Sequence, residues 1–333
     1  MSTRKDVARV AGVSDATVSH VVNGTKYVSE ELKLKVTEAI RKLDYRPNIV
    51  ARGLVTKSTK HVGLLVNDIA NPHYGNIAQG MEEVAQKNGF MVSLFMASGD
   101  PDYYFDSILQ RQMDGLYIAT TTRNTFREEH IKKLKEAGMI IVGGNYSDTS
   151  AVYFDYYPAI NNLVKYLADL GHKRIGFLSG LSITRNPDVR YSFFMESIRK
   201  YGLDVDPDLI VDGFYPYDTT HRSGYESIQK LLARKTRVTA IFSTNDLMAI
   251  GAMKAIKDAG LHINEDISVA GCDDIFLTEC VTPSLTTLRT NTQEMGRVAM
   301  GLILNGLKEK SPAKIKLDVD LIIRGSTGPA KKT

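Results

Sequence analysis

The sequence of 333 residues has no apolar run that approaches the roughly 20 residues needed to span a bilayer. Its first ten residues, MSTRKDVARV, are charged and contain no continuous apolar segment, so we expect no secretory signal there. Cysteine is scarce, and Cys272 and Cys280 fit a reducing compartment. Their spacing matches no familiar metal-binding pattern, so we expect no metal site. These absences predict a cytoplasmic protein with no membrane segment.

Motifs typical of common enzyme classes are also missing. The sequence contains no glycine-rich phosphate or dinucleotide loop, no HExxH zinc motif and no G-x-S-x-G nucleophile elbow. Its scattered aspartates and histidines form no spaced catalytic set. We therefore predict no catalytic residues, no cofactor and no enzymatic activity.

Positive charge is concentrated at the start of the chain. Residues 1–60 carry 12 Lys or Arg against 6 Asp or Glu, whereas the remaining 273 residues carry 30 against 32. This distribution is typical of a polyanion-binding module joined to a neutral body. The length of the chain predicts two or three domains.

The basic segment begins with DVARVAGVSDATVSHVVNG (6–24), which is typical of two short helices joined by a tight turn. The spacing of Val7, Val10 and Ala11 predicts an apolar face on the first helix. Gly12 would supply the turn, because a residue without a Cβ tolerates the backbone angles needed there. The pair predicts a helix-turn-helix, although any small helical bundle contains similar pairs.

The second helix of this pair would pack through valines and expose small or polar side chains. Ser14 is placed to cap its N-terminus and Gly24 to end it. Val18, Val21 and Val22 would face the first helix. The outward side chains, which could reach base edges and phosphates, are Asp15, Ala16, Thr17, Ser19 and His20.

A third helix and a linker complete the first 60 residues. Ser29 begins the third helix, whose apolar stripe consists of Leu32, Val36, Ala39, Ile40 and Leu43. Pro47 follows a DNA-binding domain predicted over residues 1–46, because the residue before a proline leaves helical angles. Residues 47–60 read as a hinge helix and linker. A helix this short is marginal alone, so we expect it to fold against DNA or a partner copy.

From residue 61 onward, apolar runs alternate with amphipathic helices. Strands are predicted in segments 61–68, 90–97, 115–120, 139–145, 152–155, 171–180, 209–213, 238–243 and 267–273. Helices are predicted near 77–87, 103–113, 127–137, 159–170, 224–232 and 247–259. Near-continuous apolar strands in βα units indicate parallel sheets covered on both faces. We expect two α/β lobes with a ligand cleft between them.

The order of these segments resembles the LacI/GalR (lactose-repressor/galactose-repressor) family of bacterial transcription regulators over essentially the whole chain. The matching stretches are DVARVAGVSDATVSHVVNG, KVTEAIRKLDYRPNIVARGL, VGLLVNDIANPHY, LADLGHKRIGF, TAIFSTNDLMAIGAMKAI and SVAGCDDIFLTECVTPSLTTL. The resemblance implies a small all-α headpiece plus an α/β two-lobed periplasmic-binding-protein-like (type I) effector domain over 61–333. Its N-lobe would comprise about 61–160 and 291–320, and its C-lobe about 161–290 and 321–333.

The same resemblance implies how operator DNA is read. The family's recognition positions fall on Asp15, Ala16 and His20. His20 could donate to guanine, and Ala16 could contact a thymine methyl group. Asp15 could accept from cytosine or simply favour the helix dipole. Contacts to phosphates, which position the protein without specifying sequence, are expected from Thr3, Ser14, Thr17, Ser19 and Asn23.

Leu54 matches the family's hinge leucine, which inserts between base pairs in the minor groove. An apolar wedge of this kind unstacks a base step and kinks DNA. The alternative is a leucine in the core between the lobes. Two hinge helices would have to pair at one step, so we expect a homodimer on a pseudo-palindromic operator, with a tetramer as the alternative.

By the same analogy, a set of polar and aromatic residues converges on the cleft: His73, Tyr74, Arg190, Tyr215, Asn245 and Asp273. The set suits a small sugar or sugar phosphate. Each residue also has a structural alternative: Asn245 and Asp273 could cap the segments that follow them, and Arg190 could form a surface ion pair.

The sequence thus predicts a ligand-responsive, sequence-specific DNA-binding regulator, cytoplasmic and associated with the bacterial nucleoid, that represses carbohydrate-utilisation genes. Its effector would change the angle between the lobes and so the spacing of the hinges. The alternatives are a purine- or nucleoside-responsive regulator, a regulator dependent on a phosphocarrier protein, or a sugar-binding module without DNA binding.

Overall fold

The computed structural model describes residues 2–24, 26–46, 58–97, 101–120, 126–144, 146, 148–185, 188–213, 217–234, 236–308 and 311–331. The chain forms two compact units, Met1–Lys60 and His61–Thr333, which are described separately. Across these described ranges, no helix combines the length and the apolar character needed to cross a membrane.

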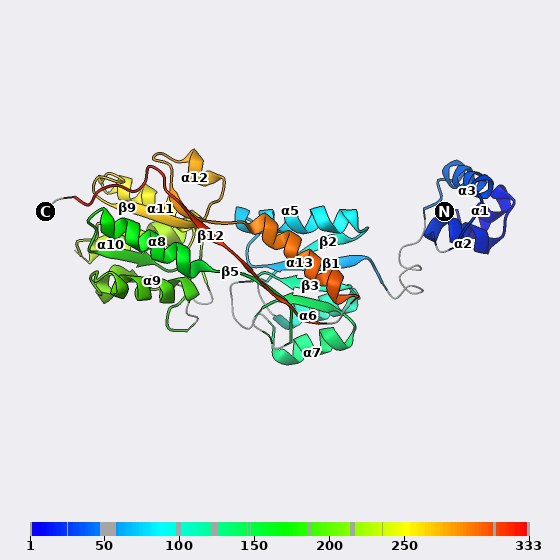
Figure 1. The fold of residues 1–333 in the computed structure, drawn as a ribbon, viewed down its shortest axis with the longest axis horizontal. Helices are drawn as coiled ribbons and strands as arrows, with labels where there is room; N and C mark the ends of the chain where they lie inside the picture. Colours follow the sequence, from blue (N-terminus) through cyan, green and yellow to red (C-terminus); the bar gives the residue numbers. More distant parts are fainter. Residues whose placement is uncertain are drawn as a thin grey trace. The chain divides into compact units, whose positions relative to one another are not determined.

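The first unit contains α1 (Arg4–Ala11), α2 (Asp15–Asn23) and α3 (Glu30–Lys42) (Figure 1). These helices confirm the helix-turn-helix and the third helix. Val7, Val18 and Val36 are fully buried and form the centre of the core. The expectation for Val10 is wrong: its side chain is 44% exposed, because Ala8 instead lies beside Val7 on the buried face of α1.

Caps fix the ends of the first two helices, and those at Gly12, Ser14 and Gly24 are the ones predicted from the sequence. Thr3 and Asp6 form a capping box at the start of α1. Gly12 ends α1 with φ of 66°, in the left-handed region that favours glycine. Ser14 caps α2, since its Oγ accepts from the backbone N–H of Thr17. Gly24 ends α2 with φ of 62°.

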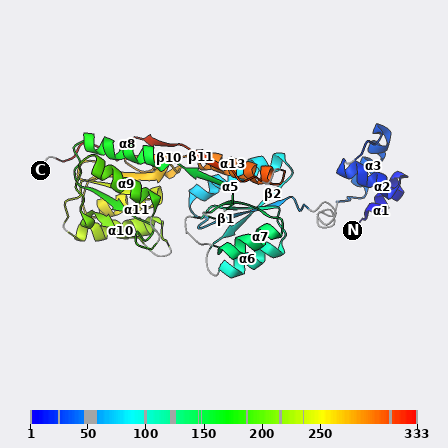
Figure 2. The same ribbon diagram turned by 60° about the horizontal axis from the view of Figure 1, so that its bottom comes forward.

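In the N-lobe of the second unit, four parallel strands lie in the order β2-β1-β3-β4. Their bounds are β1 (His61–Val66), β2 (Met91–Met96), β3 (Gly115–Ile118) and β4 (Ile140–Gly143). Helices α5 (Pro72–Lys87) and α13 (Thr292–Gly306) cover one face, and α6 (Pro101–Gln110) and α7 (Glu128–Glu136) cover the other (Figure 2). The expectation of buried strands is wrong for β2, where Met91 and Leu94 are exposed because β2 lies at the sheet edge.

The C-lobe contains a six-stranded sheet in the order β12-β10-β9-β8-β6-β7, parallel except for the pairing of β10 with β12. Its strands are β6 (Ile175–Leu178), β7 (Ile210–Val211), β8 (Ala240–Ser243), β9 (Ser268–Asp273), β10 (Thr286–Thr290) and β12 (Val319–Ile322). The helices are α8 (Tyr156–Asp169), α9 (Val189–Lys200), α10 (His221–Ala233), α11 (Asp246–Asp258) and the short α12 (Leu277–Cys280), with a 3-10 turn at Pro207–Leu209. Helices α8 and α9 lie on one side of this sheet, and α10 and α11 on the other (Figure 2).

The chain passes between the lobes at three places: from β5 (Ala151–Phe154) to α8, from β10 to α13, and from β11 (Lys314–Leu317) to β12. Strands β5 and β11 pair in parallel, so two of the passages lie side by side. Helix α8 starts at Tyr156, four residues before the lobe limit of 160 expected from the sequence, and β12 starts at Val319, one residue before the expected limit of 320. The carboxyl ends of the parallel strands in both sheets therefore face the region where these three chain segments connect the lobes.

Candidate functional site

The outward face of α2 is partly occupied by contacts within the first unit. Arg4 donates to Asp15 through both Nε (2.8 Å to Oδ1) and Nη2 (2.6 Å to Oδ2). The hydrogen bond from Arg4 lowers the pKa of Asp15 below its usual value. The Asp15 carboxylate is thus held by its own chain, in addition to the two roles that the sequence suggested.

The other expected DNA contacts lie along the same helix. Ser14 Oγ and Thr17 Oγ1 are 2.8 Å apart, and Asn23 Nδ2 donates to Ser19 Oγ at 3.2 Å. Ala16 is exposed and His20 half-buried. Contact of these residues with DNA stays a prediction, and Leu54 lies outside the described residues.

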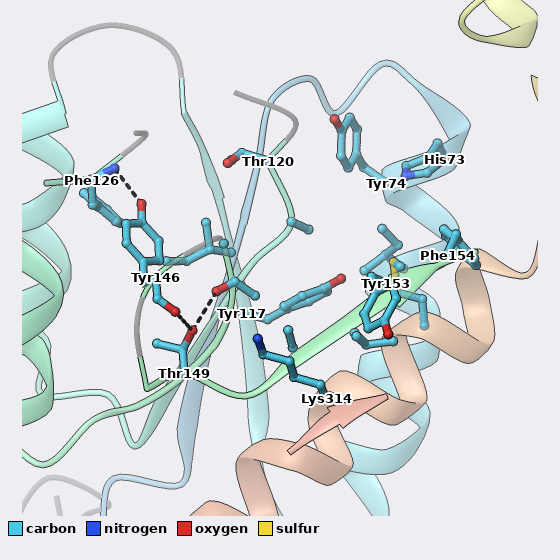
Figure 3. A pocket seen from close by; sticks show the side chains of 18 of the residues that line it. His73, Tyr74, Tyr117, Thr120, Phe126, Tyr146, Thr149, Tyr153, Phe154 and Lys314 are labelled. Atoms are coloured by element: carbon cyan, nitrogen blue, oxygen red, sulfur yellow. Dashed lines mark hydrogen bonds between the residues drawn. The ribbon is translucent and has the colours of Figure 1, made fainter. Parts of the chain in front are cut away.

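A cavity of about 1170 Å³ lies in the second unit and is lined by residues of both lobes. Figure 3 shows its N-lobe wall, with His73, Tyr117 and Tyr146 among the labelled residues. Its lining includes the expected residues His73, Tyr74, Arg190, Asn245 and Asp273. Tyr215 lies outside the described residues. Much of the remaining lining is not marked by any motif in the sequence and was not predicted, including Tyr117, Phe126, Tyr146, Tyr153, Tyr156 and Lys314.

His73 and Asp273 face each other from opposite lobes. Asn71 caps α5 by accepting from the backbone N–H of His73 (3.0 Å), and Pro72 occupies the first turn. His73 Nδ1 lies 3.2 Å from Asp273 Oδ1. The two atoms lack hydrogen-bond geometry, and both are buried without a hydrogen-bond partner among the described residues. Because an unsatisfied buried polar atom costs about 1–3 kcal/mol, this pair favours a polar ligand.

The backbone beyond β9 is held in an unusual conformation. Asp273 and Asp274 have φ of 118° and 58°, in the left-handed region that residues with a Cβ rarely adopt. Asp274 accepts from Arg289 Nε (2.6 Å) and Arg324 Nη1 (2.7 Å). Burial alone would raise the pKa of Asp274. The hydrogen bonds from Arg324 and Arg289 outweigh this effect and hold the pKa of Asp274 below its usual value. These arginines therefore stabilise the turn that presents Asp273 to the cavity.

Arg190 belongs to a buried ion pair, so the alternative of a surface pair is wrong. Asp188 caps α9 and accepts from Arg190 Nη2 at 2.8 Å. Arg190 Nη1 also donates to the carbonyl oxygen of Thr244 at 2.8 Å. The guanidinium lies over the Tyr156 ring, 5.4 Å from its centroid. These contacts fix Arg190 at the cavity wall with donor capacity remaining, since a guanidinium carries five N–H groups.

Asn245 caps α11, which is the structural role predicted for it as an alternative to ligand binding. Its Oδ1 accepts from the backbone N–H of Met248 at 3.0 Å, and its Nδ2 donates to the carbonyl oxygen of Thr219 at 3.0 Å. Both Asn245 and Thr219 line the cavity. Asn245 therefore combines a structural role with a place in the candidate site.

A direct hydrogen bond joins the lobes beside the cavity. Tyr217, which precedes α10, donates from Oη to the carbonyl oxygen of Asn67 at 3.0 Å. Asn67 follows β1, and its side-chain Oδ1 accepts from Tyr74 Oη at 3.1 Å. The sequence carries no motif that marks Tyr217, because this contact depends on how the lobes meet.

The fold and the cavity define a class: a helix-turn-helix headpiece on a two-lobed, ligand-binding α/β body. Residues 3–48 match the family described as bacterial regulatory proteins, lacI family, and residues 164–327 match a periplasmic binding protein-like domain. The chain is 32% identical to the HTH-type transcriptional repressor PurR of Pasteurella multocida (strain Pm70) over 98% of each chain. The chain belongs to the LacI/GalR family of bacterial transcription regulators.

Two solved structures extend the comparison. The lac repressor dimer bound to operator and the anti-inducer ONPF is similar with a TM-score of 0.83 and 26% identity, covering 98% of this chain and 99% of that chain. A LacI family transcriptional regulator from Enterococcus faecium with bound ribose has a TM-score of 0.71 and 27% identity, covering 81% of this chain and all (100%) of that chain.

Proposed function

We propose that the protein is a ligand-responsive, sequence-specific repressor of carbohydrate-utilisation genes that binds a pseudo-palindromic operator as a dimer. The basic first unit supports DNA binding, and its capped helix α2 presents small and polar side chains outward. The similarity to a repressor dimer bound to operator supports the dimer. Recognition helices would read the major groove, and Leu54 would insert into the minor groove.

The effector in this proposal is a small sugar bound in the cavity between the lobes. The proposal of a sugar effector rests on two buried atoms that lack a hydrogen-bond partner among the described residues. These atoms, His73 Nδ1 and Asp273 Oδ1, lie 3.2 Å apart. A sugar hydroxyl both donates and accepts, so one or two adjacent hydroxyls would satisfy both atoms. Tyr74 and Tyr156 supply aromatic surface for the apolar face of a sugar ring. The ribose-bound relative supports the same ligand class.

Regulation would follow from the two-lobed placement of these groups. His73 lies on α5 of the N-lobe and Asp273 at the end of β9 in the C-lobe. A ligand that binds both would stabilise one angle between the lobes over another. If the affinity for the effector differs between two lobe angles, binding of the effector and binding of the operator are coupled, because each ligand changes the affinity for the other by the same factor.

A thermal-shift screen tests the effector. Common sugars, sugar phosphates, nucleobases and nucleosides are added to the full-length protein. We expect a sugar to raise Tm, and Asp273→Ala to abolish that rise. Asp169→Ala is the matched control, since Asp169 pairs with Lys165 on the exposed side of α8. A rise produced by a nucleobase and by no sugar would overturn the proposed effector.

A further inference from the structure

Arg4 and Asp15 join the first two helices across the turn of the helix-turn-helix. Each is the first residue of its helix, and each helix start is held by a side-chain cap, from Thr3 in α1 and from Ser14 in α2. The two helices also share one buried core. The backbone positions of Arg4 and Asp15 are therefore fixed relative to each other, and the contact between their side chains connects two rigid helix ends.

The Arg4 guanidinium binds Asp15 along one of its edges. Nε and Nη2 donate to the two carboxylate oxygens, at 2.8 and 2.6 Å. A guanidinium carries five N–H groups in a planar fork, and this bidentate contact uses two of them. Nη1 donates to no described residue, so the edge formed by Nη1 and the second N–H of Nη2 stays open. Half of the Arg4 side chain (50%) is exposed to solvent.

The guanidinium of Arg4 lies beside the start of α2, which is the end that contacts base edges in a helix-turn-helix. Two parallel N–H groups on one guanidinium match O6 and N7 of guanine, the commonest specific contact in the major groove. Asp15 alone would be repelled by phosphates, but as the partner of Arg4 it holds the fork in one orientation. Ala16, the next outward side chain, is exposed and too short to compete for the same base edge.

We propose that Arg4 is a base-reading residue that donates to O6 and N7 of a guanine through its open edge, with Asp15 as the positioning residue that holds the fork. The sequence predicts major-groove contacts from α2 alone, at Asp15, Ala16 and His20. A residue of α1 therefore adds one guanine to the recognised half-site. This inference rests on the proposed function, because it concerns the operator of the same dimer.

Replacement of single guanines tests the contact. The full-length protein selects a palindromic fragment from a random DNA library, and fluorescence anisotropy measures the Kd. Each guanine of one half-site is then replaced in turn by 7-deazaguanine, which lacks the N7 acceptor. We expect one replacement to weaken binding of the parent at least about threefold and to leave binding of Arg4→Ala unchanged. At the same base pair, the parent should prefer G·C over A·T about 5- to 150-fold, and Arg4→Ala should show no preference.

Two further variants separate reading from positioning. Asp15→Ala releases the fork, so it should reduce the 7-deazaguanine effect without abolishing it, and the double variant should behave as Arg4→Ala does. Arg9→Ala is the matched control, because it removes an arginine paired with an aspartate, Asp6, on the same helix. Arg9→Ala should keep the full 7-deazaguanine effect of the parent.

Three results would overturn the reading by Arg4. Equal weakening of Arg4→Ala on selected and scrambled fragments, with a salt slope smaller by about 1, would make Arg4 a phosphate contact. A preference that survives in Arg4→Ala and is lost in Asp15→Ala would make Asp15 the reader. A half-site in which no guanine depends on Arg4 would exclude the contact. Each of these results leaves the sequence-specific regulator standing, whereas failure to select any palindromic fragment would refute the proposed function and this inference with it.

Discussion

Buried charges give the C-lobe side of the cavity its structure. Asp188 and Arg190 are both buried and hydrogen-bonded to each other, and Asp188 also caps α9. A buried pair of this kind contributes little net stability, but removing one partner leaves the other charge uncompensated. Arg190 at the cavity wall is therefore also the residue that neutralises the cap of its own helix.

Arg190→Ala tests this dependence. The substitution should lower the free energy of unfolding by about 3–5 kcal/mol, because the Asp188 carboxylate stays buried without its partner. Adding Asp188→Asn should recover part of the loss, since asparagine caps a helix without a charge. Urea denaturation measures both variants. Arg222→Ala, at an exposed pair with Glu226, should have little effect, and an equally small effect of Arg190→Ala would contradict the account.

Asp246 predicts a pH dependence of stability. It is fully buried, and it accepts from Thr287 Oγ1 and the backbone N–H of Ile275. Burial, and then the nearby Asp273, raise its pKa well above the ordinary 3.8. Between 3.8 and this raised pKa the folded state holds a proton that the unfolded state releases, so stability falls as pH rises through that window.

Asp246→Asn should remove this fall. An asparagine can accept from Ile275 and donate to Thr287, so the fold is kept while the titration is lost. Between about pH 5 and about pH 8, the urea midpoint of the parent should decrease more steeply than that of the variant. Asp258→Asn, at an exposed pair with Lys254, should leave the slope of the parent unchanged. Parallel profiles for the parent and Asp246→Asn would refute the assignment.

The limits of prediction from sequence are clearest at single residues. His73, Asn245 and Asp273 follow strands or begin helices, and such positions are visible in the pattern of apolar runs. Tyr117 was missed because it sits inside the strand segment 115–120, where an aromatic residue looks like core. The sequence did not reveal Asp188 as the buried partner of Arg190. The burial of this pair depends on Tyr156 at the start of helix α8, whose ring packs against the Arg190 guanidinium.

At the scale of elements, helix pairs in both lobes approach closely through glycines. A Cβ on Gly80 of α5 would meet the carbonyl oxygen of Gln293, and one on Gly296 of α13 would meet that of Ile77. Gly251 of α11 likewise faces the backbone of His221 in α10. Backbone cannot move aside as a flexible side chain can, so these crossings fix the distance between the helices.

A pair of substitutions on α5 tests the crossing. Gly80→Ala should destabilise the protein by about 1–3 kcal/mol or more, because the methyl group forces α5 and α13 apart. Gly75→Ala, on the same helix with open space around its Cα, should stabilise by about 0.5–1 kcal/mol through helix propensity. Thermal unfolding measures both. A similar Tm for the two variants would contradict the proposed role of the crossing.

The helices and strands of the fold were predictable wherever the apolar residues recur with a clear period along the sequence. Central strands such as β1, β8 and β9 are nearly continuous apolar runs, and each lies within a segment that was predicted to be a strand. Helices α9, α12 and α13 and strands β10, β11 and β12 were not expected. Exposed Lys314 and Lys316 in β11 give no buried-strand pattern, because within the described part of the chain this strand pairs with β5 alone.

For the whole molecule, the sequence predicts that residues 47–60 form a hinge and linker between the headpiece and the two-lobed body. Leu54→Ala should weaken binding to a selected palindromic DNA fragment about tenfold or more and change binding to a scrambled fragment little, because wedge insertion belongs to the specific complex. Fluorescence anisotropy with both fragments measures the difference. Leu307→Ala, a half-exposed leucine after α13, serves as control. Equal weakening on both fragments would argue against the wedge.

We expect a sugar bound between the lobes to control DNA binding by the first unit. The most direct test of this expectation is the Kd for the selected palindromic fragment, measured with and without the sugar that raises Tm. We expect the Kd to change by about 5–150-fold in the parent, the usual range of coupling, and not to change in Asp273→Ala. A Kd that stays the same at saturating sugar, or an Asp273→Ala protein that responds as the parent does, would contradict it.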